Sequence, residues 1–505
     1  MRRTVMIHSA YGLFPMLEYE LDIAQRHLDE GDKVIFLKCS GNVLQCHANN
    51  APTRPALRHC WLCKSRAKHG MEWLREGCGS LKVVDFENLN REQGQEVRRR
   101  LLEIQRAPQG SAEFIEACNV DGVDIFEAAL STLIGRYRNP TLTAEYNPDN
   151  FKELIRVGLI SYYSFQNHVQ ENTPKLCYIF NGRIVRYRPA LRVCQRMGMP
   201  VYTYEYPLEG FKRYALIKDV YPHDLPEVSK QLLEAYAKSR LSEKRKFALA
   251  RTWYEKRIAR STQSNLIQPV AEQSGVSGFT VLITTSTEYE YAGLVEGRIG
   301  YFYRNQLDAL EQILSTLAGE VTFTIRIHPY SANDEWFIAE KIMSLQGSHP
   351  GVNVISPRSD ADTYLLMAGA DLVLTFGSTT GAEAAFMRKP VIVVGAGFYK
   401  AFALAAHPDS HEQLVALVRQ AKTGDFSGFP SEHQRYVGAL RYGFAFAFTA
   451  RKAKFVKRSS YLGGGMVRRG LYTEIRANRA LAAIVRLTSL PTRILQYLRA
   501  AGSKR

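Results

Sequence analysis

Residues 372–384 read LVLTFGSTTGAEA, an apolar run followed directly by glycines, hydroxyl side chains and an alanine-rich segment. The apolar run has the length and character of a strand that is buried on both faces. Gly377 breaks this run, and Thr380–Arg388 has the composition of a helix. A strand that leads through a glycine loop into a helix is the repeating unit of parallel α/β sheets.

The same alternation extends through the second half of the chain. Strand-like apolar runs occur at Phe279–Thr285, Val321–Ile327, Val352–Ser356, Leu372–Phe376 and Val391–Val394. Segments with helical periodicity separate them, at Asn305–Leu317, Asp334–Leu345, Ala361–Ala368 and Thr380–Arg388. This order predicts a doubly wound parallel sheet, in a Rossmann-like domain over residues 276–425.

The first half of the chain repeats the pattern less regularly. Strands are predicted at Thr4–His8, Val34–Leu37, Leu176–Phe180 and Val201–Tyr204, and helices at Ser111–Arg136 and Phe151–His168. We therefore expect a second Rossmann-like domain over residues 1–215, with a cysteine-rich insertion at about 39–78. Residues 216–275 are interpreted as a helical bridge and linker, and 426–505 as a basic helical tail. The predicted fold class is α/β with two Rossmann-like domains.

Composition and charge narrow the class of protein. The chain has 505 residues, of which 46% are hydrophobic and 23% charged, which is typical of globular proteins of two or three domains. No stretch reaches the ~18 apolar residues that a membrane span needs, and the first apolar run is too short for a signal peptide. The sequence thus favours a cytoplasmic location.

The net charge of +17 is concentrated at one end. Residues 451–505 contain 14 Lys or Arg and one acidic residue, Glu474, so the rest of the chain is nearly neutral. A basic tail with interleaved apolar residues favours an anionic membrane surface, which would make the protein peripheral on the inner face of the plasma membrane. Nucleic acid is disfavoured as a partner, because the basic residues do not extend along the whole chain.

Two segments in the second half lie where a doubly wound sheet binds its ligands, beyond the carboxyl ends of the strands. The first is Arg326-Ile327-His328-Pro329. The second is Gly377-Ser378-Thr379-Thr380-Gly381-Ala382-Glu383-Ala384. Its glycines allow close backbone approach, and its hydroxyl and N–H groups suit the phosphate of a nucleotide sugar. Glu383 is expected one turn into the helix, close enough to accept hydrogen bonds from ribose hydroxyls.

The Arg-x-His-Pro segment, the Gly-Ser-Thr-Thr-Gly-Ala-Glu-Ala segment and the run Lys389–Gly395 together resemble the bacterial capsule polysaccharide biosynthesis glycosyltransferases. These are two-domain (GT-B type) enzymes similar in pattern to the Kdo and sialic acid transferases. The resemblance implies that His328 and Pro329 hold the nucleotide of the donor. It also implies that Ser378 and Thr379 hold its phosphate. The chemistry of the two segments adds Gly377, Thr380, Arg326 and Glu383 as further candidates for donor binding. A CMP-linked or UDP-linked sugar is the expected donor.

The resemblance extends to the first half. Asn181, Arg183 and Arg188 follow a predicted strand and are expected to bind the acceptor, a polysaccharide or a lipid-linked saccharide. An inverting transfer needs a general base. Glu127 is the preferred candidate and Glu205 the second, while Glu18, Glu20 and His8 remain open. No Asp-x-Asp motif suited to a catalytic divalent ion is evident, so Arg326 is expected to stabilise the leaving phosphate without a metal.

Four of the eight cysteines fall within 25 residues. Their spacing, Cys39-x6-Cys46-x13-Cys60-x2-Cys63, suits a structural zinc site with four thiolate ligands. An iron–sulfur cluster is an alternative, and His47, His59 and Cys78 are alternative ligands. The remaining alternative is that these cysteines are free thiols in a core and a loop and bind no metal.

The sequence thus predicts a glycosyltransferase that moves a sugar from a nucleotide donor to a surface or capsular polysaccharide. Two alternatives remain open. A nucleotide-sugar epimerase would use the same fold but would need neither an acceptor site nor a basic tail. A non-catalytic binding or assembly protein of the polysaccharide machinery would have no use for an intact donor site.

Overall fold

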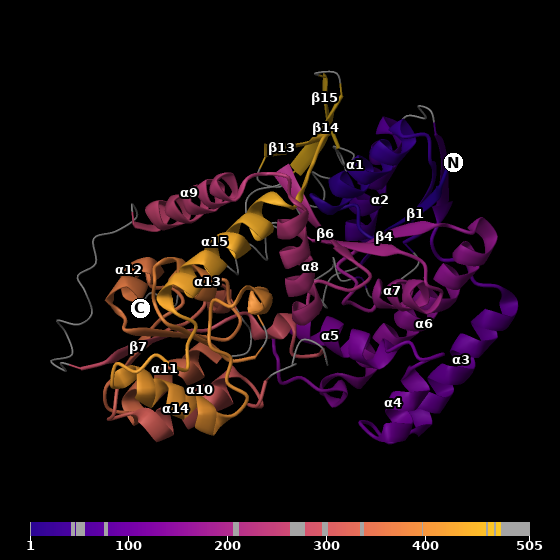
Figure 1. The fold of residues 1–505 in the computed structure, drawn as a ribbon. Coiled ribbons are helices and arrows are strands. Elements are labelled where there is room, and N and C mark those ends of the chain that lie inside the picture. Colours follow the sequence, from indigo (N-terminus) through magenta and orange to yellow (C-terminus); the bar gives the residue numbers. More distant parts are fainter. Residues whose placement is uncertain are drawn as a thin grey trace. The chain divides into compact units, whose positions relative to one another are not determined.

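The computed structural model describes residues 2–41, 46, 56–74, 79–205, 212–262, 278–294, 301–333, 338–395, 397–460, 463–468 and 471–475. The chain divides into two compact units (Figure 1). Unit 1 comprises Met1–Thr132, Ala144–Asp219 and Arg451–Arg505, and unit 2 comprises Leu133–Thr143 and Val220–Ala450. Each unit contains a sheet of parallel strands flanked by helices, so the predicted pair of Rossmann-like α/β domains is confirmed.

Unit 1 is built on a seven-stranded sheet in the order β12-β6-β5-β4-β1-β2-β3. The first five strands in sequence pair in parallel, and β6 and β12 are antiparallel additions at one edge. The strands are β1 (Thr4–Ser9), β2 (Lys33–Lys38), β3 (Ser80–Asp85), β4 (Leu176–Phe180), β5 (Val201–Glu205), β6 (Arg213–Lys218) and β12 (Arg451–Lys452). The helices are α1 (Met16–Asp29), α2 (Ala56–Trp73), α3 (Arg91–Arg106), α4 (Ala112–Cys118), α5 (Ile125–Tyr137, continuing into unit 2), α6 (Pro148–Asn172) and α7 (Arg188–Arg196).

Unit 2 contains a five-stranded, fully parallel sheet in the order β11-β10-β7-β8-β9. The strands are β7 (Thr280–Thr284), β8 (Thr322–Arg326), β9 (Val352–Ile355), β10 (Leu372–Thr375) and β11 (Val391–Val393). The helices are α8 (Leu225–Lys238), α9 (Glu243–Thr262), α10 (Gln306–Leu317), α11 (Ile338–Ser348), α12 (Thr363–Gly369), α13 (Thr380–Phe386), α14 (His411–Lys422) and α15 (Glu432–Phe448).

Both faces of the unit 2 sheet are buried, as its continuous apolar strands predict. Val281 and Ile283 of β7 pack into one core with α10, α11 and α14. Leu282, which points to the opposite face, packs into a second core with α9, α12, α13 and α15. Figure 1 shows these two helical layers on either side of β7.

The strand order of unit 2 reverses between β7 and β10. The chain proceeds from β7 through β8 to β9 and then returns to place β10 on the other side of β7. At such a reversal the loops beyond the carboxyl ends of the two strands diverge, and ligands bind in the crevice between them. The loops after β7, β8 and β10 therefore define the edge at which a site is expected.

The predicted helical bridge within residues 216–275 forms α8 and α9, but both helices belong to unit 2. Tyr236 of α8 and Trp253 and Tyr254 of α9 lie in the same core as α15. The large apolar side chains among the charges of this segment are what attach the helices to that core. The predicted linker, residues 263–277, lies outside the described residues.

The prediction of a helical tail is correct for α15 and wrong for residues 451–475. In their described part, these residues form β12 and a small antiparallel sheet of β13 (Val456–Ser460), β14 (Gly463–Arg468) and β15 (Leu471–Glu474). The cause is long-range pairing, because Arg451 and Lys452 pair with β6. In addition, Asp22 of α1 accepts hydrogen bonds from the N–H groups of Lys454 and Phe455, both at 2.7 Å. Residues 476–505, where the amphipathic pattern lies, fall outside the described residues.

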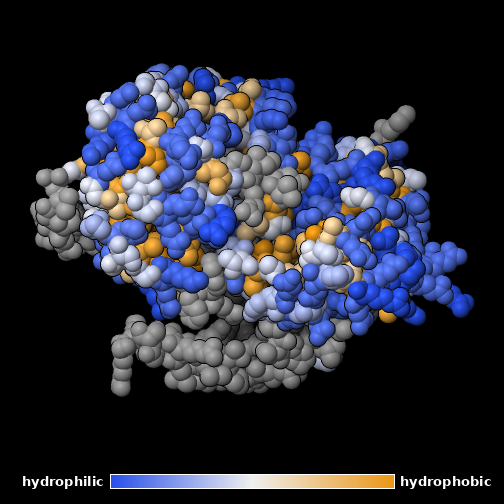
Figure 2. Space-filling model, turned by 90° about the horizontal axis from the view of Figure 1, so that it is seen from below, coloured by the Kyte–Doolittle hydropathy of each residue, from blue (hydrophilic) through white to orange (hydrophobic). Residues whose placement is uncertain are grey.

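The described residues on the face shown in Figure 2 are mainly hydrophilic. In Figure 2, hydrophobic side chains among the described residues occur in small scattered areas. Within the described part of the chain, no helix combines the length and apolar character needed to cross a bilayer.

Glu20 is a fully buried carboxyl group at the end of the unit 1 sheet. It accepts hydrogen bonds from Ser9 Oγ at 2.5 Å and from Tyr204 Oη at 2.6 Å. Burial raises the pKa of Glu20 to about 8, although both hydrogen bonds oppose the rise. The native state therefore retains a proton on Glu20 at neutral pH, where the unfolded chain has lost it.

This difference predicts a pH-dependent stability. Between the unfolded pKa of about 4.3 and the native value of about 8, the native state binds more protons, so the free energy of unfolding falls as pH rises. We expect Glu20→Gln to remove this fall in the free energy of unfolding. Thermal melting at a series of pH values measures it: the wild-type melting temperature should fall, relative to the variant, from pH ~5 to pH ~8. Glu113→Gln, at an exposed site of the same unit, is the control and should follow the wild type.

Candidate functional site

The glycine loop after β10 is held in place from two sides. Thr284 Oγ1, at the end of β7, and Thr380 Oγ1, at the start of α13, lie 2.8 Å apart and share a hydrogen bond. The Tyr399 hydroxyl donates to the carbonyl oxygen of Ser378 at 2.8 Å. Gly381 makes room for this contact, because a Cβ there would lie 2.3 Å from the Tyr399 hydroxyl. These contacts fix the conformation of the loop at the point where the strand order reverses.

The hydroxyl groups of the loop differ in their contacts: Ser378 Oγ accepts from the N–H of Thr380 at 3.4 Å. Thr379 is the N-cap residue of α13, but its side chain makes no capping hydrogen bond. Thr380 is directed to β7 instead. Gly377, with φ 78°, adopts a left-handed conformation that favours glycine. Ser378 and Thr379 remain half-buried at this edge.

His328 lies at the same edge, two residues after β8. Its backbone N–H donates to Thr285 Oγ1 at 2.8 Å, which joins the loops after β8 and β7. Nδ1 accepts from the N–H of Tyr330 at 3.2 Å, so the neutral ring carries its hydrogen on Nε2. Burial, and then the charge of Arg326, lower the pKa of His328. The residue is therefore a neutral Nε2–H donor at pH 7, and Pro329 beside it is exposed.

Arg326 ends β8 and is buried. Its guanidinium donates to the carbonyl oxygen of Ser356 and, at 3.1 Å, to that of Ser359. In this structure the side chain therefore fixes the loop after β9. A contact between Arg326 and the donor phosphate remains a prediction.

Glu383 has a partner that sequence spacing did not reveal. Arg257 of α9 donates to Glu383 Oε1 from Nε at 2.9 Å and from Nη2 at 2.6 Å. The Glu383 side chain is 4% exposed and that of Arg257 is 22% exposed. In this structure Glu383 joins α13 to α9, and its predicted role as a ribose acceptor would require it to leave or share this ion pair.

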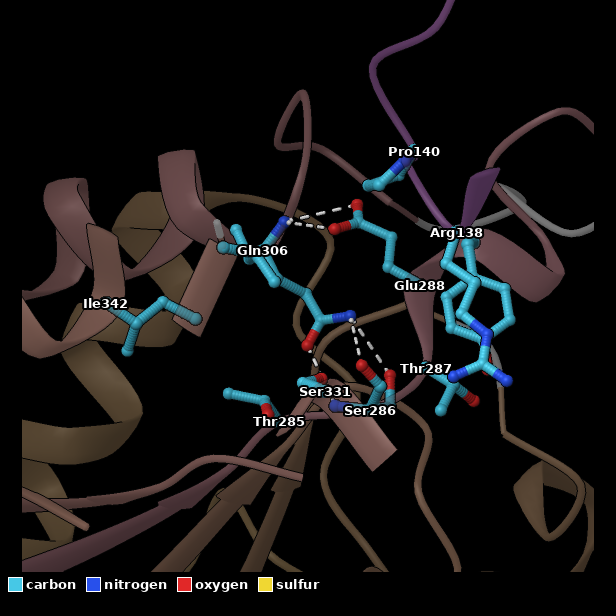
Figure 3. A pocket seen from close by; sticks show the side chains of 11 residues that line it. Arg138, Pro140, Thr285, Ser286, Thr287, Glu288, Gln306, Ser331 and Ile342 are labelled. Carbon is cyan, nitrogen blue, oxygen red and sulfur yellow. Dashed lines mark hydrogen bonds between the residues drawn. The ribbon is translucent and has the colours of Figure 1, made fainter. Parts of the chain in front are cut away.

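A small pocket with a cavity volume of about 20 Å³ lies beside this edge in unit 2. Figure 3 shows Gln306, at the start of α10, with hydrogen bonds to Glu288 on one side and to Ser286 on the other. The Gln306 side-chain amide donates to Ser286 Oγ at 3.1 Å, and its backbone N–H donates to the carboxylate of Glu288 at 3.2 Å. Thr285 and Ser331 line the same pocket, along with Arg138 from the segment that α5 carries into unit 2.

In unit 1, Asn181 and Glu205 come together at the ends of β4 and β5. Asn181, with φ 54°, donates from Nδ2 to Glu205 Oε2 at 2.6 Å. Its Oδ1 accepts from the N–H of Arg183 at 3.1 Å. The Arg183 guanidinium donates to Ser131 Oγ at 3.3 Å.

A charged cluster forms at the start of α7. Arg188 donates to Asp124 at 3.0 Å, and Arg192 donates to the same carboxylate at 2.8 and 2.6 Å. Glu127 lies one turn further along α5, and its Oε2 is buried with no hydrogen-bond partner among the described residues. Burial raises the pKa of Glu127, and Asp124 raises it further against the opposing charges of Arg188 and Arg192. A carboxyl group with a raised pKa and a spare oxygen has the properties of a general base.

The other candidate bases are less available. Glu18 is buried and pairs with Arg66 at 2.5 Å. Glu20 is fully buried between two hydroxyl groups. His8 is also fully buried, with its ring stacked on Phe86 at 4.0 Å between centroids.

The four candidate metal ligands are all described. Cys39 follows β2, Cys60 and Cys63 lie on α2, and each is half-buried and outside any disulfide, as is Cys46. Within the described residues, one group of potential ligands has three donor atoms within 4.8 Å of one another. It consists of His27, Glu30 and Asp32, and its two carboxylates pair with Arg3. The sulfur atoms are thus farther apart than a bound ion would hold them, and the zinc site remains a prediction. The alternative ligands His47 and Cys78 lie outside the described residues.

Two groups of site residues were not anticipated from the sequence. The pocket residues Thr285, Ser286 and Glu288 follow β7 directly, so the rule that ligands bind beyond strand ends could have identified them. Arg138 and Arg257 could not have been identified in this way, because each reaches the site from a distant part of the sequence.

Comparison with known families gives one match. The sequence model of the family described as "Capsule polysaccharide biosynthesis protein" matches residues 212–426, which include all of unit 2 from α8 to α14. The resemblance inferred from the motifs is thus confirmed for this segment. No curated protein sequence matches the chain.

Solved structures with a similar chain course have low sequence identity. The beta Kdo 2,4 transferase of KpsC from Thermosulfurimonas dismutans is 13% identical, with a TM-score of 0.33, over 60% of this chain and 85% of its own. The UDP-GlcNAc 2-epimerase from Neisseria meningitidis, bound to UDP-GlcNAc, is 10% identical, with a TM-score of 0.30, over 88% and 97%. Anabaena HepE, in complex with UDP and glucose, is 13% identical, with a TM-score of 0.27, over 90% and 96%.

The ion pair between Glu383 and Arg257 predicts a stability effect. Glu383→Ala leaves the Arg257 guanidinium largely buried without its carboxylate and should lower the free energy of unfolding by about 3 kcal/mol. The double variant Glu383→Leu/Arg257→Met replaces both charges by apolar groups and should lose much less. Urea denaturation of the three proteins measures both values. A loss below about 1 kcal/mol in Glu383→Ala would show that the pair does not stabilise the fold and would leave Glu383 available to a ligand.

Proposed function

We propose that this chain, whose residues 212–426 belong to the capsule polysaccharide biosynthesis family, is a glycosyltransferase that uses a nucleotide-sugar donor. The observation that carries the proposal is the polar edge of unit 2 at the strand reversal. It combines a fixed glycine loop, the half-buried hydroxyl groups of Ser378 and Thr379 and the neutral donor His328. Backbone N–H groups, hydroxyl groups and a ring N–H are donors that suit a phosphate.

In the proposed reaction, unit 2 holds the nucleotide sugar and unit 1 holds the acceptor near Asn181 and Arg188. Glu127 removes the proton from an acceptor hydroxyl, whose oxygen forms a bond to the anomeric carbon. The bond from that carbon to the phosphate oxygen breaks, and the nucleotide leaves with the bonding electrons. The raised pKa of Glu127 is one support for its role as base. The Asp360-Ala361-Asp362 sequence is not assigned to a metal, because Asp362 caps α12 by accepting from Tyr364 N at 2.7 Å.

The acceptor is proposed to be a surface or capsular polysaccharide or its lipid-linked precursor. The basic tail supports this choice, because 14 basic residues and one acidic residue between 451 and 505 would attract an anionic membrane surface. Transfer should therefore be assayed in the presence of anionic lipid.

The donor proposal is tested by nucleotide-induced stabilisation. CMP, CDP, UDP, GDP and ADP are compared, and one of them should stabilise the native protein by about 2.7 kcal/mol at roughly 100 times its Kd. His328→Ala should weaken this stabilisation because it removes an Nε2–H donor. His433→Ala, on the exposed face of α15, is the matched control and should respond as the wild type does. If no nucleotide stabilises a well-folded sample, the alternative of a non-catalytic binding protein takes precedence.

The base is tested by activity. Glu127→Gln keeps the size of the side chain but cannot accept a proton, so kcat should fall by roughly 10²- to 10⁴-fold while nucleotide stabilisation is unchanged. Glu116→Gln, at an exposed position of α4, should retain full activity. Release of the nucleotide only when acceptor is present would identify a transferase. Conversion of the sugar on an intact donor without acceptor would identify an epimerase and contradict the proposal.

A further inference from the structure

The cysteine cluster in unit 1 is not used by the proposed transfer. Its members come from three places: the end of β2, the segment that follows it, and one face of α2, where Cys60 and Cys63 are one turn apart. β2 and β3 are neighbours in the sheet, and α2 is the connection between them. The chain therefore enters α2 after the carboxyl end of β2, the strand end that Cys39 follows.

Two of the sulfur atoms already accept backbone hydrogen bonds. The N–H of Gly12, in the loop after β1, donates to Cys63 Sγ at 2.7 Å, and the N–H of Gly41 donates to Cys39 Sγ at 3.3 Å. Gly12 lies so close to α2 that a Cβ there would be 2.1 Å from the carbonyl oxygen of Cys63. Backbone N–H groups directed at sulfur are the outer-shell contacts that stabilise metal-bound thiolates.

Arg186 supplies a second, independent observation. Its side chain is 7% exposed and pairs through Nη2 with Glu87. Its Nη1 is buried and has no hydrogen-bond partner among the described residues. Cys39 Sγ lies 3.9 Å from Glu87 Oε1, the same carboxylate oxygen that Arg186 Nη2 contacts. A buried cation with an unused donor, joined to Cys39 through one carboxylate, indicates that further negative charge belongs at this position.

We propose that Cys39, Cys46, Cys60 and Cys63 bind one Zn²⁺ as a closed structural site and that Arg186 compensates its negative charge. Four thiols release four protons on binding, which leaves the zinc–tetrathiolate unit with a charge of −2. Arg186 neutralises part of this charge and can direct its free Nη1 to a sulfur atom. Because the sulfur atoms do not gather within 4.8 Å in the described structure, binding must draw them together. Zinc would then link β2 and α2 and, through Gly12, the loop after β1.

The first experiment measures metal in the full-length protein. The wild type should contain about one zinc per chain after purification, and Cys60→Ser and Cys63→Ser should each lose it. Cys118→Ser, a buried cysteine of α4 outside the cluster, should retain the metal. Replacement of zinc by Co²⁺ should give the thiolate charge-transfer and visible bands of a tetrahedral cobalt site, and these bands should be absent from Cys63→Ser.

The second experiment tests Arg186. Arg186→Gln should weaken zinc binding roughly 10- to 100-fold, as loss of an outer-shell partner does. Arg192→Gln, which removes a carboxylate-paired arginine elsewhere in unit 1, is the control and should leave zinc affinity unchanged. A well-folded wild type that neither contains nor takes up zinc would overturn the proposal, as would equal zinc loss in Cys118→Ser. Iron with acid-labile sulfide in place of zinc would overturn it in favour of an iron–sulfur cluster.

Discussion

The burial of the unit 2 sheet on both faces is the constraint on which its site depends. Val281 and Ile283 of β7 enter one core and Leu282 enters the other, so no polar side chain of the strand interior is available for binding. The polar groups that a ligand can reach are therefore expected where the strands end. The return of the chain from β9 to β10 then brings the ends of β7 and β10 together, and Thr284 and Thr380 share a hydrogen bond across that point. The site is therefore a consequence of strand order.

This constraint also explains how much could be predicted from the sequence. Apolar runs with regular spacing identified the strands of unit 2, and the residues after those runs identified its polar edge, because both features are local. The partner of Glu383 could not be predicted, because Arg257 is 126 positions away and reaches it through the packing of α9 on α13. The same limit applies to residues 451–475. Their basic composition suggested a helix, but pairing of Arg451 with β6 and the hydrogen bonds to Asp22 determine their structure.

Unit 1 also contains a sheet of parallel strands, but more polar groups are buried in its interior. Where β1 ends, Glu20 is buried between Ser9 and Tyr204, and His8 is buried against Phe86. Burial opposes the charged form of both residues, so it raises the pKa of Glu20 and lowers that of His8. Both therefore remain uncharged near neutral pH, and the buried groups at this strand end are polar but neutral. Glu127, with its spare oxygen and its two arginine neighbours, is better suited to exchange a proton with an acceptor.

The pair of Glu383 and Arg257 affects how the motif itself should be interpreted. A glutamate one turn into the helix after a glycine loop is expected to accept hydrogen bonds from ribose, yet here Glu383 Oε1 accepts two contacts from Arg257. A ligand hydroxyl would have to compete with a charge-assisted contact that is largely shielded from water. His328 faces no such competition, because its Nδ1 is occupied by Tyr330 while its Nε2–H is not bonded to a described residue. Recognition of the donor is therefore expected to depend on the neutral histidine and the loop hydroxyls, with Glu383 holding α13 in the position that the loop requires.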